Sequence, residues 1–481
     1  MDSSSARMGP IRQKGAEVPA QPGFARTAAR WRPVRRGLIR SRRYRRPAAG
    51  LGVLLLLLIP VIWGAPASAS TAVDCGSGAN LQTAINQAAP GSTLALTGTC
   101  KGNFAIGKDL TLKGQRPPGF PEATLDGQGS GTTLTVTSGR VHLIHLTITG
   151  GNTDQGGGID NAARLWLERA IVTGNIAADG GGIVNTGVLR LTRSFVTSNG
   201  NGTTYDRASH PDQGILNEGG LTLVSSVVSL NEGGGIWNQT GSLLMERSSV
   251  RGNQVGGARA AGLENDASAT ITDSTVSDGF TEYDGTPGVV NMGSMTIAFS
   301  TIARNYGFNN NSGGGGIENG GTLTVTSSTI SENSSDAITG SGIANGDPLN
   351  GTSPGTVKIS GTILAGNDGG DCLGPITSEG YNIVGTLFGY PDCRFKARRT
   401  DVRGSTTSSV DPRLESLGFH GGPTETMPPR AGSPAVNAIP VGAISADLST
   451  ALCPTSGTTD QRGVPRPQGA ACEIGAVEMR G

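Results

Sequence analysis

Acidic side chains are the residues of this chain whose type and spacing could support catalysis. Glu264 and Glu318 occupy one position of a short repeated phrase, two copies apart, and Glu218 and Asp266 share another position, also two copies apart. Cleavage of a glycosidic bond usually needs two carboxyl groups, about 5–5.5 Å apart for retention or about 6.5–9.5 Å for inversion. If the copies stack as coils, both pairs lie roughly 9.6 Å apart. Because no two neighbouring copies are both acidic, the pattern favours a solvated face over a catalytic pair.

Other candidate chemistry is sparse. Asn152-Thr153-Asp154 matches a short phrase of polygalacturonases, but the other phrases of those enzymes are missing and a three-residue match arises easily by chance. The chain has four histidines, no Cys-x-x-Cys and no calcium-type cluster of aspartates. Trp166 and Trp237 point outward by alternation and could stack on sugar rings, although single exposed aromatics are common. We therefore predict no catalytic residue, no metal and no cofactor.

The elements that must position these side chains come from an internal repeat. The phrase Gly-Gly-Gly-Ile-x-Asn, in full or weaker form, recurs eight times between residues 156 and 345, and a second phrase, roughly Leu-x-Leu-x-x-Ser-x-Val-x-x-Asn, follows it. A period of roughly 21–32 residues with apolar residues at alternating positions is typical of a solenoid. The asparagines that end the first phrase are Asn161, Asn185, Asn217, Asn238, Asn265, Asn291, Asn319 and Asn345. Those that end the second are Asn175, Asn199, Asn231, Asn253, Asn305, Asn333 and Asn367, with Gly279 in the fifth copy.

This pattern predicts an all-β fold, a right-handed parallel β-helix with three short strands per coil. The apolar residue two positions before the asparagine of each Gly-Gly-Gly-Ile-x-Asn phrase should stack in one interior column. Each buried side chain contributes about 1.5–3 kcal/mol before entropy is subtracted. The column contains Ile159, Ile183, Ile215, Ile236, Leu263, Val289, Ile317 and Ile343. The asparagines should form two ladders at the bends, because a buried amide without a partner costs about 1–3 kcal/mol.

Both ends of the solenoid need covers, because an open end exposes a strand edge. Asn80 to Ala89 spaces its apolar residues at helical intervals and predicts an N-terminal capping helix. Beyond Asn367 the repeat ends and Pro-rich, Cys-bearing sequence follows. We therefore divide the chain into a leader (1–69), a β-helix with its cap (70–370) and a small C-terminal module (371–481).

The charge distribution marks the leader. Residues 1–69 carry 13 Lys and Arg against 2 Asp and Glu, whereas residues 70–481 carry 25 against 35, a balance that argues against nucleic acid as a partner. An Arg-rich stretch, an apolar stretch from Leu51 to Trp63 and the small residues Ala67-Ser68-Ala69 are typical of a secretory signal peptide. About 13 apolar residues fall short of the roughly 20 that a spanning helix needs. We expect cleavage and export without a stable membrane span, with an uncleaved anchor as the alternative.

Six cysteines lie in the exported part, as three sequence-local pairs. An even number of cysteines in an exported chain favours disulfides, although six allow fifteen connectivities. The candidates are Cys75, Cys100, Cys372, Cys393, Cys453 and Cys472.

The repeats resemble those of exported bacterial β-helix proteins and, more loosely, those of polymorphic outer-membrane proteins. The C-terminal phrases resemble the choice-of-anchor module that ends many secreted β-helix proteins. The phrases that carry this second resemblance include Tyr381 to Gly385, Gly421 to Thr424, Gly432 to Ala435, Thr459 to Gly463 and Cys472 to Glu478. Because no sorting motif follows Glu478, we expect release or non-covalent retention rather than covalent surface attachment.

These observations predict a secreted or cell-surface protein with a structural, adhesive or glycan-binding role. Its expected partner is an extracellular polysaccharide or a cell-surface component, and no nucleic acid. The alternative is a polysaccharide-cleaving enzyme, pectate-lyase-like or a glycoside hydrolase, whose site is built from variable loops. The loops Gly200 to Gln213 and Phe280 to Gly288 are the expected place for either function.

Overall fold

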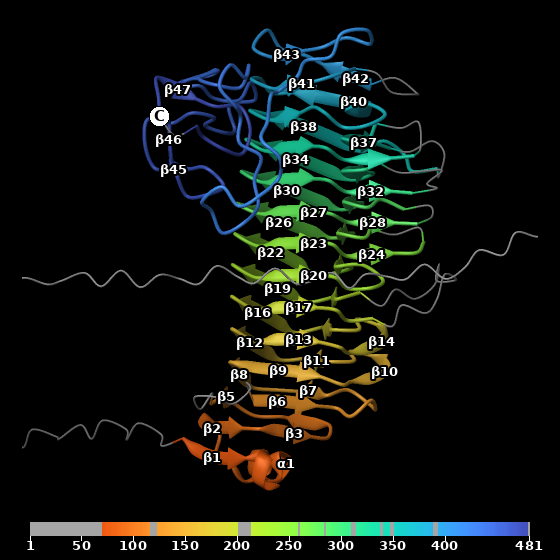
Figure 1. The fold of residues 1–481 in the computed structure, drawn as a ribbon, viewed down its shortest axis with the longest axis vertical. Coiled ribbons are helices and arrows are strands. Elements are labelled where there is room, and N and C mark those ends of the chain that lie inside the picture. The colour runs from red at the N-terminus through yellow and green to blue at the C-terminus, as the bar shows by residue number, and fades with distance from the viewer. Residues whose placement is uncertain are drawn as a thin grey trace, which may run out of the picture. The chain divides into compact units, whose positions relative to one another are not determined.

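The computed structural model describes residues 70–115, 123–200, 213–257, 260–282, 285–308, 314–336, 340–346, 351–387 and 393–479. The predicted leader and most of the loop Gly200 to Gln213 lie outside these ranges, as do residues 283–284 of the loop Phe280 to Gly288. The described strands wind into a right-handed parallel β-helix whose coils stack along one axis (Figure 1). The fold class predicted from the sequence is therefore confirmed.

Three long parallel sheets form the walls of the column. Sheet A contains β1 (Thr71–Asp74), β2 (Ser92–Thr97), β5 (Leu110–Gly114), β8 (Arg140–Ile144), β12 (Arg164–Glu168), β16 (Val188–Thr192), β19 (Gly220–Val224), β22 (Ser242–Glu246), β26 (Ser268–Thr272), β30 (Ser294–Ala298), β34 (Thr322–Thr326), β38 (Thr356–Ser360), β40 (Cys372–Ser378) and β42 (Cys393–Lys396). Sheet B contains β3 (Thr99–Lys101), β6 (Ala123–Asp126), β9 (Leu146–Thr149), β13 (Ile171–Thr173), β17 (Phe195–Thr197), β20 (Val227–Ser229), β23 (Ser249–Arg251), β27 (Thr275–Ser277), β31 (Thr301–Ala303), β35 (Thr329–Ser331), β39 (Ile363–Leu364), β41 (Ile383–Val384) and β43 (Val402–Arg403).

Sheet C carries the Ile-x-Asn phrases, and its last strand, β37, also pairs with β40. Its strands are β4 (Phe104–Ile106), β7 (Leu134–Val136), β11 (Ile159–Asn161), β15 (Ile183–Asn185), β18 (Ile215–Asn217), β21 (Ile236–Asn238), β25 (Leu263–Asn265), β29 (Val289–Asn291), β33 (Ile317–Asn319) and β37 (Ile343–Asn345). Two short ladders lie outside the three walls: β10 (Asn152–Gln155) with β14 (Ile176–Asp179), and β24 (Gln254–Val255), β28 (Phe280–Thr281), β32 (Tyr306–Gly307) and β36 (Ser334–Ser335).

The predicted interior column runs the length of sheet C. The apolar residue of each Ile-x-Asn strand pairs with its equivalent in the next coil, as Ile159 does with Ile183 and Ile183 with Ile215. Every member of the column from Ile159 to Ile343 is at most 1% exposed. Stacking of identical positions lets one coil's apolar surface cover the next, so the core is continuous along the axis.

A short helix closes the N-terminal end of the column. Helix α1 (Leu81–Gln87) begins after Asn80, whose side chain accepts a hydrogen bond from the backbone N–H of Thr83 at 2.8 Å. Its buried residues, Leu81 and Ile85, belong to the same apolar core as the first coils. The predicted capping helix is thus present, at the bottom of Figure 1.

The glycines directly before the Ile column are needed for close approach between coils. A Cβ atom at Gly158 would lie 2.6 Å from the carbonyl oxygen of Gly182, and one at Gly235 would lie 2.6 Å from that of Gly262. Positive φ occurs instead at the start of the phrase, for example at Gly156 and Gly180. The phrase therefore combines a left-handed turn with a contact that no larger residue permits.

The parallel ladders continue past residue 370, through β40 and β42 in sheet A and through β41 and β43 in sheet B. Residues 404–479, here called the C-terminal segment, follow them and contain only short strands: β44 (Ile439–Pro440) with β47 (Ala471–Cys472), and β45 (Thr458–Thr459) with β46 (Pro465–Arg466). The segment lies beside the later coils in Figure 1. The division at residues 370 and 371 stays a prediction.

Candidate functional site

The asparagines named from the sequence lie at two bends of the coil, buried in the column. In the first ladder each side-chain amide donates to the next one along, from Asn161 to Asn345, at 2.7–2.9 Å. In the second ladder the same bond joins Asn175 to Asn253 and Asn305 to Asn367, at 2.8–3.0 Å. Gly279 interrupts the second ladder. These amides hydrogen-bond to one another and to neighbouring backbone groups.

A third ladder was missed at the sequence level. One residue per coil at the bend between sheets A and B donates its backbone N–H to a serine hydroxyl of the next coil, at 3.1–3.2 Å. The series runs from Ala170 to Ser300. The accepting residues are Ser194, Ser226, Ser248, Ser274, Ser300 and Ser328. The constant serine of the second repeat phrase was the signal for it.

Three disulfides join the six cysteines. Cys75–Cys100 links the first turn to β3, Cys372–Cys393 links β40 to β42, and Cys453–Cys472 lies within the C-terminal segment. All three pairs are local in sequence, with separations of 25, 21 and 19 residues. They tie down the two ends of the coil stack and the segment beside it.

The acidic pair Glu264 and Glu318 lies on the outward column of sheet C, with Val290 between them. Glu318 is only 3% exposed and accepts hydrogen bonds from the hydroxyls of Thr286 and Thr352, at 2.7 and 3.0 Å. The expectation of a solvated face is therefore wrong at Glu318, because side chains from neighbouring coils surround it. A carboxylate held by two hydroxyls is engaged in the structure rather than open to a substrate.

The second acidic pair does not converge either. Asp266 accepts a hydrogen bond from the indole Nε1 of Trp237 at 2.7 Å. Glu218 is exposed two coils away. Trp237 is thereby fixed by a polar contact at one edge of sheet C.

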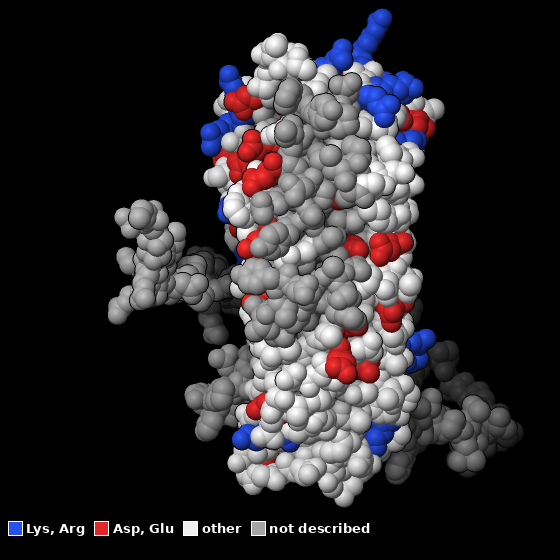
Figure 2. Space-filling view, turned by 90° about the vertical axis from the view of Figure 1, so that its right-hand side faces the viewer, with Lys and Arg blue, Asp and Glu red and all other residues white. Residues whose placement is uncertain are grey.

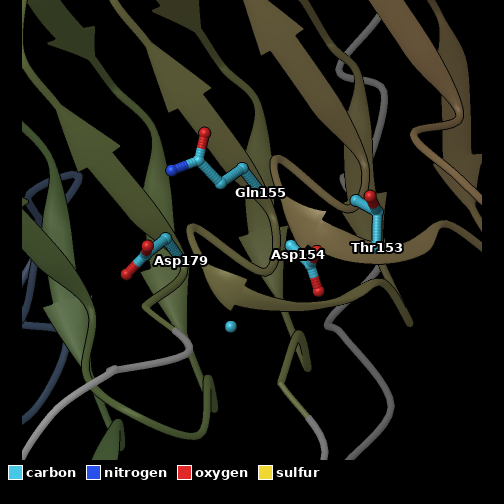
Figure 3. A pocket seen from close by; sticks show the side chains of 5 residues that line it. Thr153, Asp154, Gln155 and Asp179 are labelled. Carbon is cyan, nitrogen blue, oxygen red and sulfur yellow. The ribbon is translucent and has the colours of Figure 1, made fainter.

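Asn152-Thr153-Asp154 forms most of β10, beside a surface cavity of about 560 Å³ that Asp154 and Asp179 line (Figure 3). Asp179 lies opposite Gln155 in the ladder, so Asp154 is offset from it by one residue. The two carboxylates point in different directions in Figure 3. The two acids that line this cavity are thus not directed at one another.

The outer face of sheet A over β8, β12 and β16 carries a different group of side chains. Trp166 is half-buried and packs against His142 in the preceding coil, with ring centroids 4.4 Å apart and an interplanar angle of 42°. Burial lowers the pKa of His142, although Glu168 opposes this effect. The imidazole is therefore mainly neutral at pH 7 and lies as a second, tilted ring beside the indole. Arg190 follows Trp166 in the next coil.

A groove of about 680 Å³ borders this aromatic pair. It lies at the bend between sheets C and A and is lined by Asp109, Arg140, Arg164 and Val188, among others. Arg140 precedes His142 and Arg164 precedes Trp166 by two residues on the same strands, so they share the outward face. We call Arg140, His142, Arg164, Trp166 and Arg190 the sheet A strip.

The later coils are covered by the C-terminal segment. The hydroxyl of Thr275 donates to the backbone oxygen of Glu425, and that of Thr301 to Oε1 of Gln461, both at 2.6 Å. Gln461 in turn donates to Ser274 and Thr275 through its amide nitrogen. These contacts bury the outward hydroxyls of Thr275 and Thr301, and the outward Ser249 and Thr329 of β23 and β35 are buried as well.

A buried cluster of charges holds the segment together. Arg466 forms an ion pair with Glu478 at 3.0 Å, with both side chains fully buried, and donates to the backbone oxygens of Glu473 and Gly475. Burial raises the pKa of Glu473 to about 8, helped by a hydrogen bond with Glu478. Arg462 pairs with Asp460 at 2.8 Å. These residues belong to the phrases that carry the choice-of-anchor resemblance, and their contacts are internal.

Two classes of site are not found in the described ranges. No group of three or more His, Cys, Asp or Glu lies close enough together there to hold a metal ion. No helix within those ranges is long and apolar enough to cross a membrane. On the face shown in Figure 2, most visible charged side chains between the two ends of the column are acidic.

Comparison with known proteins adds little. No protein-family model matches the chain, and no curated protein does either. Among solved structures, that of pectate lyase Pel9A is similar, with a TM-score of 0.41 and 13% sequence identity over 83% of this chain and 90% of that chain. At this identity and score the likeness says nothing about activity.

Proposed function

We propose that this chain is exported and works outside the cell as a glycan-binding β-helix protein. The pair of Trp166 and His142, whose tilted rings lie in contact on the outer face of sheet A, carries the proposal. A flat aromatic surface beside a groove suits the apolar face of a sugar ring, and its polar neighbours suit the hydroxyls. Three disulfides support an oxidising compartment and hence export.

Binding rather than cleavage is the better-supported part of this role. Neither predicted acidic pair converges: one member is buried against two hydroxyls, and another accepts a bond from Trp237. A structural or adhesive protein needs only a rigid surface, which the three ladders and the disulfides provide. The leader, the polymorphic outer-membrane likeness and the choice-of-anchor assignment of residues 371–481 belong to the same proposal and suit a cell-surface protein.

A polysaccharide panel tests this function. The purified protein should bind at least one polymer, and Trp166→Ala should weaken that binding about tenfold or more, as expected for a central aromatic contact. Phe195→Ala is the matched control, because Phe195 is another exposed aromatic, 43% exposed, on sheet B. Failure to bind any polymer, or equal losses in both variants, would exclude the proposed site. New reducing or unsaturated ends would show an enzyme instead.

A further inference from the structure

We propose that the ligand of the sheet A strip is an anionic polysaccharide whose carboxylates are held by Arg140, Arg164 and Arg190. This inference rests on the proposed function and goes beyond it by assigning the charge of the ligand and the residues that recognise that charge.

Seven arginines of the described ranges have a carboxylate partner. The pairs within the described ranges join Arg169 to Glu168, Arg247 to Glu246, Arg251 to Glu425, Arg304 to Asp278, Arg398 to Glu379, Arg462 to Asp460 and Arg466 to Glu478. The guanidinium groups of Arg140, Arg164 and Arg190 make no hydrogen bond or ion pair with any described residue, and all three are exposed. Three free guanidinium groups therefore meet on one face.

Their spacing follows from the coil. Arg140 and Arg164 are register partners in adjacent strands, about 4.8 Å apart along the axis, and Arg190 is the register partner of Trp166 one coil further on. The cations thus flank the aromatic pair on two sides. A sugar ring lying on Trp166 would place its substituents next to guanidinium groups of three successive coils.

The chemistry of the three groups selects carboxylates. Guanidinium is planar and carries donors in a fork that matches the two oxygens of a carboxylate. The one acid on the outward face of these strands, Glu168, is already paired with Arg169 at 3.3 Å. The strip is therefore locally positive beside the single acid Asp109 of the groove lining, although residues 70–481 carry 25 Lys and Arg against 35 Asp and Glu. A uronate polymer carries its carboxylates on sugar rings, which can lie on Trp166 while the guanidinium groups bind the carboxylates, so we choose it over nucleic acid.

The test compares two forms of one polymer with the full protein. An oligogalacturonate and its methyl ester share the same sugar chain and differ in charge. We expect the free acid to bind at least tenfold more tightly than the ester, with an affinity that falls as ionic strength rises. Replacing all three arginines, Arg140→Gln with Arg164→Gln and Arg190→Gln, should weaken binding of the acid about tenfold or more and leave binding of the ester unchanged.

The control variant is Arg304→Gln, which removes one charge from a paired arginine outside the strip. It should bind the acid like the unmodified protein. Unchanged melting temperatures for the arginine variants would show that lost binding is not lost folding, since these side chains hold no other described residue.

Each other outcome overturns a defined part of the proposal. Equal binding of acid and ester, lost only in Trp166→Ala, would remove the charge assignment and leave the glycan-binding function in place. Tighter binding of single-stranded DNA than of the uronate would overturn the choice of polymer. Binding of neither form nor of any other glycan would remove both the function and this inference.

Discussion

The outer surface of sheet B differs between the early and the later coils. In β13, β17 and β20 the outward position is apolar and at least partly exposed, as Ile171, Phe195 and Val227. In the following coils the register partners are Ser249, Thr275, Thr301 and Thr329, and all four are buried under the C-terminal segment. At this position the apolar side chains are exposed and the hydroxyl side chains are buried, which is the reverse of the usual distribution.

The reason is the kind of surface that covers each region. The C-terminal segment has little regular structure, so its backbone must find hydrogen-bond partners outside itself. The outward hydroxyls supply them: Thr275 bonds to Glu425, and Thr329 accepts from the backbone N–H of Ala476. The early coils have no described cover and instead present the aromatic and cationic side chains of the sheet A strip. A buried hydroxyl column in a solenoid therefore indicates a docked segment.

The largest expected effect comes from the buried charge cluster of the C-terminal segment, which covers the later coils. Arg466→Met should reduce the free energy of unfolding by about 3–5 kcal/mol, because it leaves the buried carboxylate of Glu478 without its partner. Urea unfolding, together with limited proteolysis of the C-terminal segment, measures this loss. Arg190→Met on the bare half is the matched control and should change stability by no more than about 0.5 kcal/mol. Similar losses in both variants would refute the contrast between the two halves.

Substitutions in the interior should cost similar stability in the early coils and in the later coils that the C-terminal segment covers. Asn199→Ala under the bare coils and Asn333→Ala under the covered coils remove equivalent amides, each bonded to the next asparagine and to a backbone oxygen. Each change should cost about 1–3 kcal/mol, because the partners in the ladder lose their bonds. Chemical denaturation of the two variants checks this. A clearly larger loss at Asn333 would mean that the C-terminal segment also supports the interior, and the comparison would then extend below the surface.

Much of this architecture could be predicted from the sequence. The Ile column follows from the spacing of the phrase, because a strict repeat places identical residues at identical positions of the coil. Trp166 could be placed outward by alternation alone. The arrangement around it could not, since His142 belongs to an early coil that lacks the Gly-Gly-Gly-Ile-x-Asn phrase and so could not be aligned with Trp166.

The covered half was harder to predict for a physical reason. The C-terminal segment has no period, so no pattern tells which coils it contacts. The signal was the change at one outward position from Phe195 and Val227 to Ser249 and Thr275, which reads as ordinary solvent exposure until the segment is in place. The burial of Glu318 escaped prediction similarly, because Thr286 and Thr352 lie outside the repeated phrases.

The smallest expected effect concerns Asp273, where the coils meet the C-terminal segment, and depends on pH. Asp273 lies at the edge of the C-terminal segment, and the hydroxyl of Thr424 donates to its backbone oxygen at 3.2 Å. Burial raises the pKa of this carboxyl to about 6, against the opposing charge of Arg247 and with help from Asp460 and Glu246. The folded state therefore binds the proton more tightly than the unfolded state does. The stability that this proton contributes is fully present below about pH 4 and is lost as the pH rises through 6.

Asp273→Asn mimics the protonated carboxyl and should stabilise the protein by about 1 kcal/mol at pH 7.5, after allowance for solvent screening at this partly exposed group. Near pH 4 the difference between the variant and the unmodified protein should nearly vanish, because Asp273 is then protonated in the folded state and about half protonated in the unfolded state. Urea unfolding across this pH range measures the difference. Asp278→Asn is the control in the same coil, where the carboxyl is paired with Arg304 at 2.9 Å and should not gain stability when neutralised. A gain for Asp273→Asn that is equally large at pH 4 would show that the charge of Asp273 is not the cause. The gain in free energy of unfolding would then come from packing against the C-terminal segment.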